Sequence, residues 1–287
     1  MDKDVEINTE LYLAIQENCK IFNPSSVTME DYNRAYEVAR EIIYLRERKE
    51  IPRSRTIKFN ELLISSLTNL YKIGIDNVIK DATSIIKDLE YKEIYNSRCS
   101  SFLTNFMVEQ TGSSVCKRAV SVYVPDRLTE ASGVFMSHEV VHILKERNSL
   151  ECPNINTTLE VIPMLVELIM AFNSNPILLK EIVYERIELL YSEAKMFFRI
   201  VKELKTNKKN KDGLMAALYS NIAYLNSFYY SLALFTLYLK DSDYVIAMLK
   251  CNLSKKMTTD DIIRDSFLFD DSLDSYNSGL ACIKKVY

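Results

Sequence analysis

The chain has 287 residues, of which 48% are hydrophobic, so it can form one large domain or two smaller lobes. Its 36 basic and 39 acidic residues give a net charge of −3, which argues against a nucleic-acid partner. Only 5 Gly, 6 Pro and no Trp are present, and this composition favours long helices over a β-sandwich or barrel.

The six cysteines are scattered and include no C-x-x-C pair, so we expect neither a disulfide framework nor an all-cysteine zinc site. The N-terminal stretch MDKDVEINTELY is acidic and has no apolar run, unlike a secretory signal. These two features lead us to expect a reduced, cytoplasmic protein.

Apolar residues recur at helical spacing through the first ninety residues. Thr28 is followed three residues later by Asp31, a relative of the capping box, and Gly74 separates two further helical stretches. We expect helices over residues 10–22, 28–50, 59–74 and 75–93. Residues 1–112 would form an N-terminal helical lobe and 113–287 a catalytic lobe, with one continuous domain as the alternative.

The chain changes character after Gly112, and the valine-rich stretch Ala119–Asp126 is the best strand candidate. A loop then leads into a helix that carries both histidines. Asn175 and Pro176 are typical of the N-cap and first residue of a long amphipathic helix. The tail from residue 258 to 279 predicts a helix followed by a loosely ordered acidic end. The fold class is therefore mainly α, a bundle-like arrangement of helices with a small β element before the histidine helix and an active-site cleft.

The stretch Leu214–Leu239 contains no charged residue and is long enough to span a bilayer. It also contains serines and asparagines, and its tyrosines are spread along it rather than gathered at its ends. We therefore expect a buried central helix and no membrane partner, with a membrane span as the alternative.

His138 and His142 are the only histidines of the chain, and they lie in the sequence HEVVH. Residues four apart share one face of a helix, so both imidazoles can bind one Zn²⁺ ion while Glu139 lies beside them. The pattern H-E-x-x-H is typical of metallopeptidases, in which the glutamate takes a proton from a metal-bound water. The competing interpretation is a pair of hydrogen-bonded core histidines.

A third zinc ligand cannot be a histidine, because none remains. Glu160 is the preferred ligand, since Glu160 and Glu167 are the only charges in an otherwise apolar stretch and a buried carboxylate needs a partner. Glu167, two turns later, suits an outer role beside the ligands. Glu160 could instead complete a capping box with Thr157. The other candidate ligands are Glu167, Glu151, Glu146 and Cys152.

HEVVH followed by LEVIPMLVE resembles the gluzincin metallopeptidases, and within them the thimet oligopeptidase and oligoendopeptidase F family. The resemblance implies a largely helical fold with a zinc site deep in a cleft, Glu160 as the third ligand, and a strand at SVYVP that aligns a peptide. It also implies that tyrosines in the helix after the site, here Tyr224, Tyr229 and Tyr230, support the oxyanion. The chain departs from the family in having Val141 where glycine is usual and in lacking a further histidine.

The sequence thus predicts a zinc-dependent metallopeptidase that acts on peptides or unfolded protein segments. The alternative is a catalytically inactive, regulatory zinc-binding protein that binds peptides or a protein partner, which the two departures from the family favour. One further cluster is basic and is expected to be a solvated helix end; it comprises Arg46, Arg48, Lys49, Arg53 and Arg55.

Overall fold

The computed structural model describes residues 27–46, 50–88, 90–94, 103–111, 115–125, 127–146, 158, 160–206, 211–254, 256–267 and 272–287. These residues are mostly helical, as the composition predicts. The helices are α2 (Met29–Leu45), α3 (Phe59–Lys72), α4 (Ile79–Asp88), α5 (Glu130–Glu146), α6 (Val161–Phe172), α7 (Pro176–Thr206), α8 (Lys211–Lys240), α9 (Ser242–Leu253), α10 (Thr259–Ser266) and α11 (Ser272–Val286). The helix predicted over residues 10–22 lies outside the described residues.

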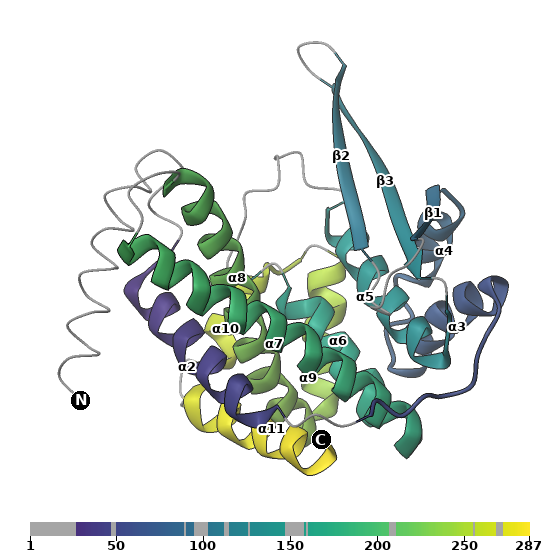
Figure 1. The fold of residues 1–287 in the computed structure, drawn as a ribbon. Helices are drawn as coiled ribbons and strands as arrows, with labels where there is room; N and C mark the ends of the chain where they lie inside the picture. The colour runs from purple at the N-terminus through teal and green to yellow at the C-terminus, as the bar shows by residue number, and fades with distance from the viewer. Residues whose placement is uncertain are drawn as a thin grey trace.

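Helix α8 lies at the centre of the helical packing, in contact with α2, α6, α7 and α11 (Figure 1). Among the described residues it is the one helix long and apolar enough to cross a membrane. However, 72% of its most apolar window is buried inside the protein. Phe228 and Phe235 are almost wholly enclosed, which is the burial expected of a core helix.

The other part of the packing is built around α5, which contacts α3, α4 and α6. Three strands lie beside it: β1 (Glu90–Ile94), β2 (Leu103–Thr111) and β3 (Val115–Pro125). The sheet order is β1-β3-β2, with β1 parallel and β2 antiparallel to β3. The helix predicted over residues 75–93 is therefore wrong at its end, because residues 90–93 pair with β3 instead of continuing α4.

The predicted N-terminal lobe does not form a unit of its own among the described residues. Helix α2 packs on α7 and α8, whereas α3 packs on α5 (Figure 1). Buried residues of α2, α3, α5, α7 and α8 all belong to one hydrophobic core. This packing agrees with one continuous domain, the alternative to two lobes.

Two predicted helix starts are confirmed by their hydrogen bonds. The Asp31 amide donates to the Thr28 hydroxyl and the Thr28 amide donates to the Asp31 carboxylate, which completes a capping box at α2. The Asn175 side chain accepts hydrogen bonds from the amides of Ile177 and Leu178 at the start of α7. The end of the tail differs from its prediction, because α11 is an ordered helix packed on α8.

Arg46 and Arg53 of the basic cluster do not form a solvated helix end, whereas the Arg55 side chain is 62% exposed. Arg46 forms a two-pronged hydrogen bond with Glu188, which joins α2 to α7. Arg53 and Arg55 bond carboxylates on α7 and α5, namely Glu181, Glu185 and Glu130. Arg48 and Lys49 lie outside the described residues. The arginines thus fasten the segment between α2 and α3 across the fold.

Candidate metal centre

Helix α5 presents both histidines from a buried position: His138 is 5% exposed and His142 6% exposed. Its opposite face packs on α3, where the Ser137 hydroxyl lies 3.0 Å from the Ser66 carbonyl oxygen and shares its one proton between that acceptor and the Gly133 carbonyl oxygen of α5. Gly133 permits this close approach, since a Cβ there would collide with the Ser65 side chain. The histidine helix is therefore rigidly seated.

Glu160 reaches the histidines from the start of α6. It is the N-cap residue, and its carbonyl accepts the first helical hydrogen bond, from the Met164 amide at 2.9 Å. Pro163 lies in the first turn, where no amide hydrogen is needed, so the proline starts this helix rather than kinking it. The capping-box alternative for Glu160 is wrong: a helix that begins at Val161 cannot have Glu160 at its third position, and the Glu160 side chain caps nothing.

Three potential ligand atoms form an equilateral triangle. His138 Nε2, His142 Nε2 and Glu160 Oε2 are each 3.1 Å from the other two. Four-coordinate zinc with bonds of about 2.0–2.1 Å has ligand atoms about 3.3 Å apart. The triangle fits such an ion with almost no movement of the side chains, and it is the group of metal-binding side chains found among the described residues.

The chemistry of the three atoms also suits a cation. The Nδ1 atom of His138 lies 3.2 Å from Oε2 of Glu167, although the angle falls short of a straight hydrogen bond. This contact favours a proton on Nδ1, which leaves a lone pair on Nε2. Lone pairs of the imidazole and of the Glu160 carboxylate then point into one small space, where they need a shared positive charge.

The pKa values of the cluster also indicate that a positive charge is needed between these atoms. Burial disfavours a charged His138, but hydrogen bonding to Glu160 and the nearby Glu167 outweighs it and raises the pKa of His138 to about 9. Burial would raise the pKa of Glu160, yet the two imidazoles hold it well below its usual range. In the metal-free cluster Glu160 is thus ionised at neutral pH and His138 carries the positive charge, so an ion bound at Nε2 of His138 would have to displace the proton there.

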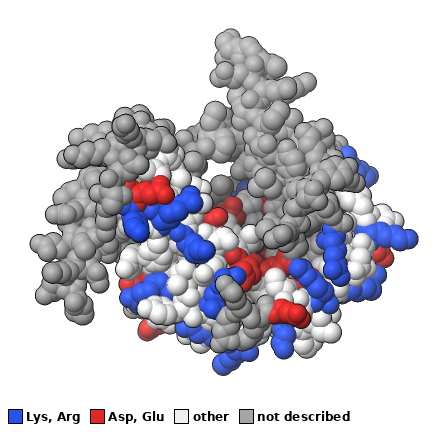
Figure 2. All heavy atoms as spheres, viewed as in Figure 1, with Lys and Arg blue, Asp and Glu red and all other residues white. Residues whose placement is uncertain are grey.

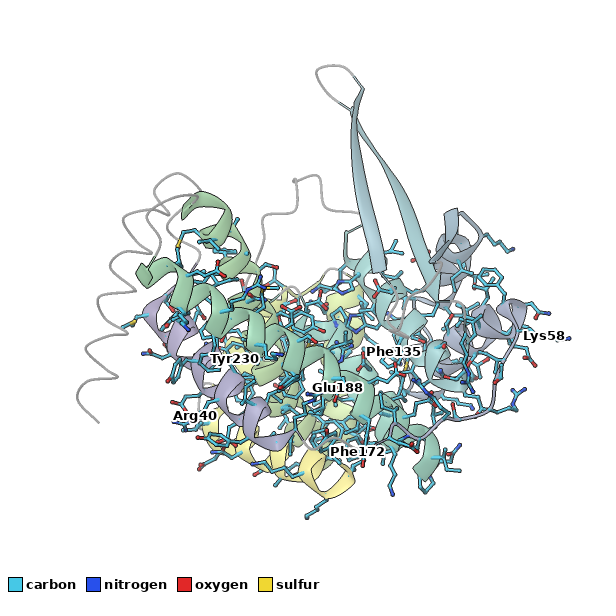
Figure 3. The ribbon with its side chains drawn as sticks, viewed as in Figure 1. Arg40, Lys58, Phe135, Phe172, Glu188 and Tyr230 are labelled. Atoms are coloured by element: carbon cyan, nitrogen blue, oxygen red, sulfur yellow. The ribbon has the colours of Figure 1, made fainter. Side chains whose placement is uncertain are left out.

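Glu167 stands behind His138 and is itself held by α7. Arg186 donates from Nε to Glu167 Oε1 at 2.8 Å and from Nη2 to Oε2. A third donor, Nη1, bonds the hydroxyl oxygen of Tyr224 on α8. Glu167 faces Nδ1 of His138 rather than the Nε2 side where the three potential ligand atoms converge, and its outer role beside a metal stays a prediction. Figure 3 labels Phe135 on α5, the helix that carries both histidines.

The remaining predicted residues differ in where they lie relative to the cluster. Glu139 follows His138 on α5 and is half-buried. Tyr224 lies at the edge of the site through Arg186, and burial raises the pKa of its hydroxyl. Of the alternative ligands, Glu151 and Cys152 lie outside the described residues, and the side chain of Glu146 is not described.

Tyr229 and Tyr230 lie elsewhere. The Tyr229 ring stacks on Tyr276 of α11 at 4.5 Å, and its hydroxyl is 3.1 Å from the Ser272 hydroxyl. The guanidinium of Arg34 on α2 lies 4.7 Å from the centre of the Tyr230 ring, and Figure 3 shows Tyr230 beside α2 and far from Phe135. Both tyrosines thus face α2 and α11, so their predicted role as oxyanion donors does not agree with their placement.

The turn of α8 explains why Tyr224 lies near the site while Tyr229 and Tyr230 lie elsewhere. Tyr224 and Ser227 lie on the face of α8 that meets the site, where the Ser227 hydroxyl accepts a hydrogen bond from the Glu160 amide at 3.3 Å. At about 100° per residue, Tyr229 lies almost opposite the middle of that face, and Tyr230 about a quarter-turn from it, toward α2.

Arg186 was not predicted. Its signal in the sequence is its position: it follows Val183 by three residues and precedes Leu190 by four, on the apolar stripe of a long amphipathic helix. A charge on such a stripe requires a buried counter-charge. Glu167, itself a charge within an apolar stretch, is that partner.

The site opens on one side. The Glu160 side chain is 22% exposed, whereas those of His138 and Glu167 are 6% and 1% exposed. On the face in Figure 2, acidic side chains lie in the middle and basic side chains gather toward its sides.

The chain matches no family of known proteins, no curated protein and no solved structure.

Proposed function

We propose that this chain is a zinc-dependent metallopeptidase of the gluzincin kind, which hydrolyses peptide bonds in peptides or unfolded protein segments. The observation that carries the proposal is the triangle of His138 Nε2, His142 Nε2 and Glu160 Oε2, with sides of 3.1 Å. Two imidazoles and one carboxylate are the ligand set of catalytic zinc sites that keep a fourth position open.

Glu139 would act as the general base and then the general acid. It follows a ligand directly in the chain, remains half-exposed and so can meet both water and substrate. Bound zinc would supply a water of lowered pKa and a polarised carbonyl. Glu139 takes the proton of that water and later passes it to the leaving amine.

The access route belongs to the same proposal. Glu160 is the most exposed of the three ligand residues, so the substrate would enter a cleft on the side where its carboxylate meets solvent. Tyr224 is the tyrosine that remains as a donor to the developing oxyanion, because its hydroxyl oxygen accepts from Arg186 and its own proton stays available. A cytoplasmic setting follows from the expected reduced cysteines.

The test combines a metal measurement with one substitution. Purified protein should contain about one zinc per chain and should cleave denatured casein, with the products followed by mass spectrometry. Glu139→Gln should retain zinc and lose cleavage, because the amide cannot accept the proton. Full cleavage by that variant would refute the mechanism. Zinc in a wild-type protein that cleaves nothing would favour the regulatory zinc-binding alternative.

A further inference from the structure

Arg186 is the only lysine or arginine among the buried side chains of the described residues. It is 6% exposed and lies within α7, far along the chain from the HEVVH sequence. A buried guanidinium is costly unless its charge and its donors are satisfied. Its position therefore requires an explanation in terms of what it contacts.

The guanidinium joins three helices behind the metal centre. Its Nε and Nη2 atoms donate hydrogen bonds to the two carboxylate oxygens of Glu167 on α6, and its Nη1 atom donates to the Tyr224 hydroxyl oxygen on α8. The Glu167 oxygen bonded by Nη2, Oε2, is also the one that lies 3.2 Å from His138 Nδ1 on α5. One carboxylate oxygen thus connects Arg186 to a proposed zinc ligand.

We propose that Arg186 is a positioning residue of the metal centre, which acts on His138 through Glu167. The inference rests on the proposed zinc function. A two-pronged guanidinium–carboxylate pair fixes the plane of the carboxylate, which a single hydrogen bond would leave free to rotate. A fixed carboxylate holds the Nδ1 side of the imidazole, and so directs Nε2 toward the triangle of ligand atoms.

Charge and geometry predict opposite effects for the loss of Arg186. As a positive charge near the ion, Arg186 repels Zn²⁺, so if charge dominated, a neutral substitution would strengthen zinc binding. As a positioning residue it preorganises His138, so the same substitution should weaken zinc binding. The sign of the change in zinc affinity therefore distinguishes the two roles.

The experiment measures zinc affinity by competition with a chromophoric chelator, and the coordination by the visible spectrum of the Co²⁺-substituted protein. Arg186→Met removes the charge, and Arg186→Lys keeps it but loses the two-pronged geometry. We expect both to bind zinc about 10- to 100-fold more weakly, the usual effect of losing an outer partner of a ligand. The Co²⁺ spectrum should change as well, since His138 is no longer held in place.

Arg53→Met is the matched control. Arg53 pairs with Glu181 and Glu185, buried carboxylates on the same helix α7, but these pairs do not touch the histidines. It should lose stability and keep wild-type zinc affinity. If Arg186→Met does not fold, Arg186→Lys and the double change Arg186→Met with Glu167→Gln, which removes both charges, provide the measurement.

A double-mutant cycle tests the route through Glu167. In a Glu167→Gln background, Arg186→Lys should produce no further loss of zinc affinity. The inference is overturned if the single Arg186 variants bind zinc within about twofold of wild type or more tightly, or if the loss persists undiminished in the Glu167→Gln background. A wild-type protein that binds no zinc would overturn the proposed function and this inference together, whereas normal wild-type binding with unaffected variants overturns only the inference.

Discussion

Removal of zinc should lower the thermal stability of this protein, and Glu160→Gln should remove most of that dependence. The three ligand atoms already stand 3.1 Å apart, against about 3.3 Å around tetrahedral zinc, so the ion would bind the folded chain without rearranging it. In the unfolded chain Glu160 is not held beside the histidines, so the ion would bind far more weakly there. Zinc would therefore stabilise the folded state selectively.

The size of the stabilisation by zinc follows from the thermodynamic linkage between binding and folding. At a free zinc concentration of 1,000 times the dissociation constant, binding adds about 4 kcal/mol to the free energy of unfolding. For a chain of this length, about 2 to 3 °C of melting temperature correspond to each kcal/mol, so the shift is about 8 to 12 °C. Glu160→Gln removes the only charged ligand and should reduce the shift to a small remainder.

The assay is differential scanning fluorimetry with zinc buffered by a chelator, repeated at several free zinc concentrations. Glu193→Gln is the matched control, since Glu193 is a partly buried carboxylate on α7 that bonds Asn221 and not the histidines. It should retain the full zinc-dependent shift. The reasoning fails if zinc leaves the wild-type melting temperature unchanged, or if Glu160→Gln responds to zinc as strongly as wild type.

Further predictions concern the fold. Phe235→Ala should lower the free energy of unfolding by about 3–5 kcal/mol, because this ring of α8 is fully buried in the core. Leu239→Ala, at a side chain that is 51% exposed, should change it by less than about 0.5 kcal/mol. Chemical denaturation measures both. Gly279→Ala should be destabilising, since its Cβ would lie 2.6 Å from the Leu232 carbonyl oxygen of α8; an unchanged melting temperature would contradict this. Thr28→Ala should cost about 1 kcal/mol through loss of the cap. After lysis without detergent, the chain should stay in the supernatant of a high-speed spin, and recovery only with detergent would support the membrane alternative for α8.

Local chemistry made several features predictable. The H-E-x-x-H spacing places both imidazoles on one helical face whatever the surroundings, because it depends only on the turn of the helix. The caps at Thr28 and Asn175 are likewise local, since the donors and the acceptors lie within three residues of one another. Glu160 was predictable by a different argument: with no third histidine in the chain, a carboxylate in an apolar stretch needs a partner.

The tertiary structure decided which side chains meet across the helices. Eighteen tyrosines and a run of them on α8 gave no means of choosing among Tyr224, Tyr229 and Tyr230, because the choice depends on which face of α8 meets α7 and which meets α2 and α11.

The same holds for charges distant in sequence. Arg186 and Glu167 lie on different helices. The apolar residues around each one in the sequence indicate a buried charge, but they do not indicate that the two charges are partners. Likewise, β1 pairs with a strand some thirty residues away, which local helix propensity does not reveal. The sequence by itself determined the helix that carries both histidines and the face that they share, because those arise from spacing within one turn. Which residues of other helices pack behind the histidines was decided only by the tertiary structure, because it depends on contacts between segments that are distant in the chain.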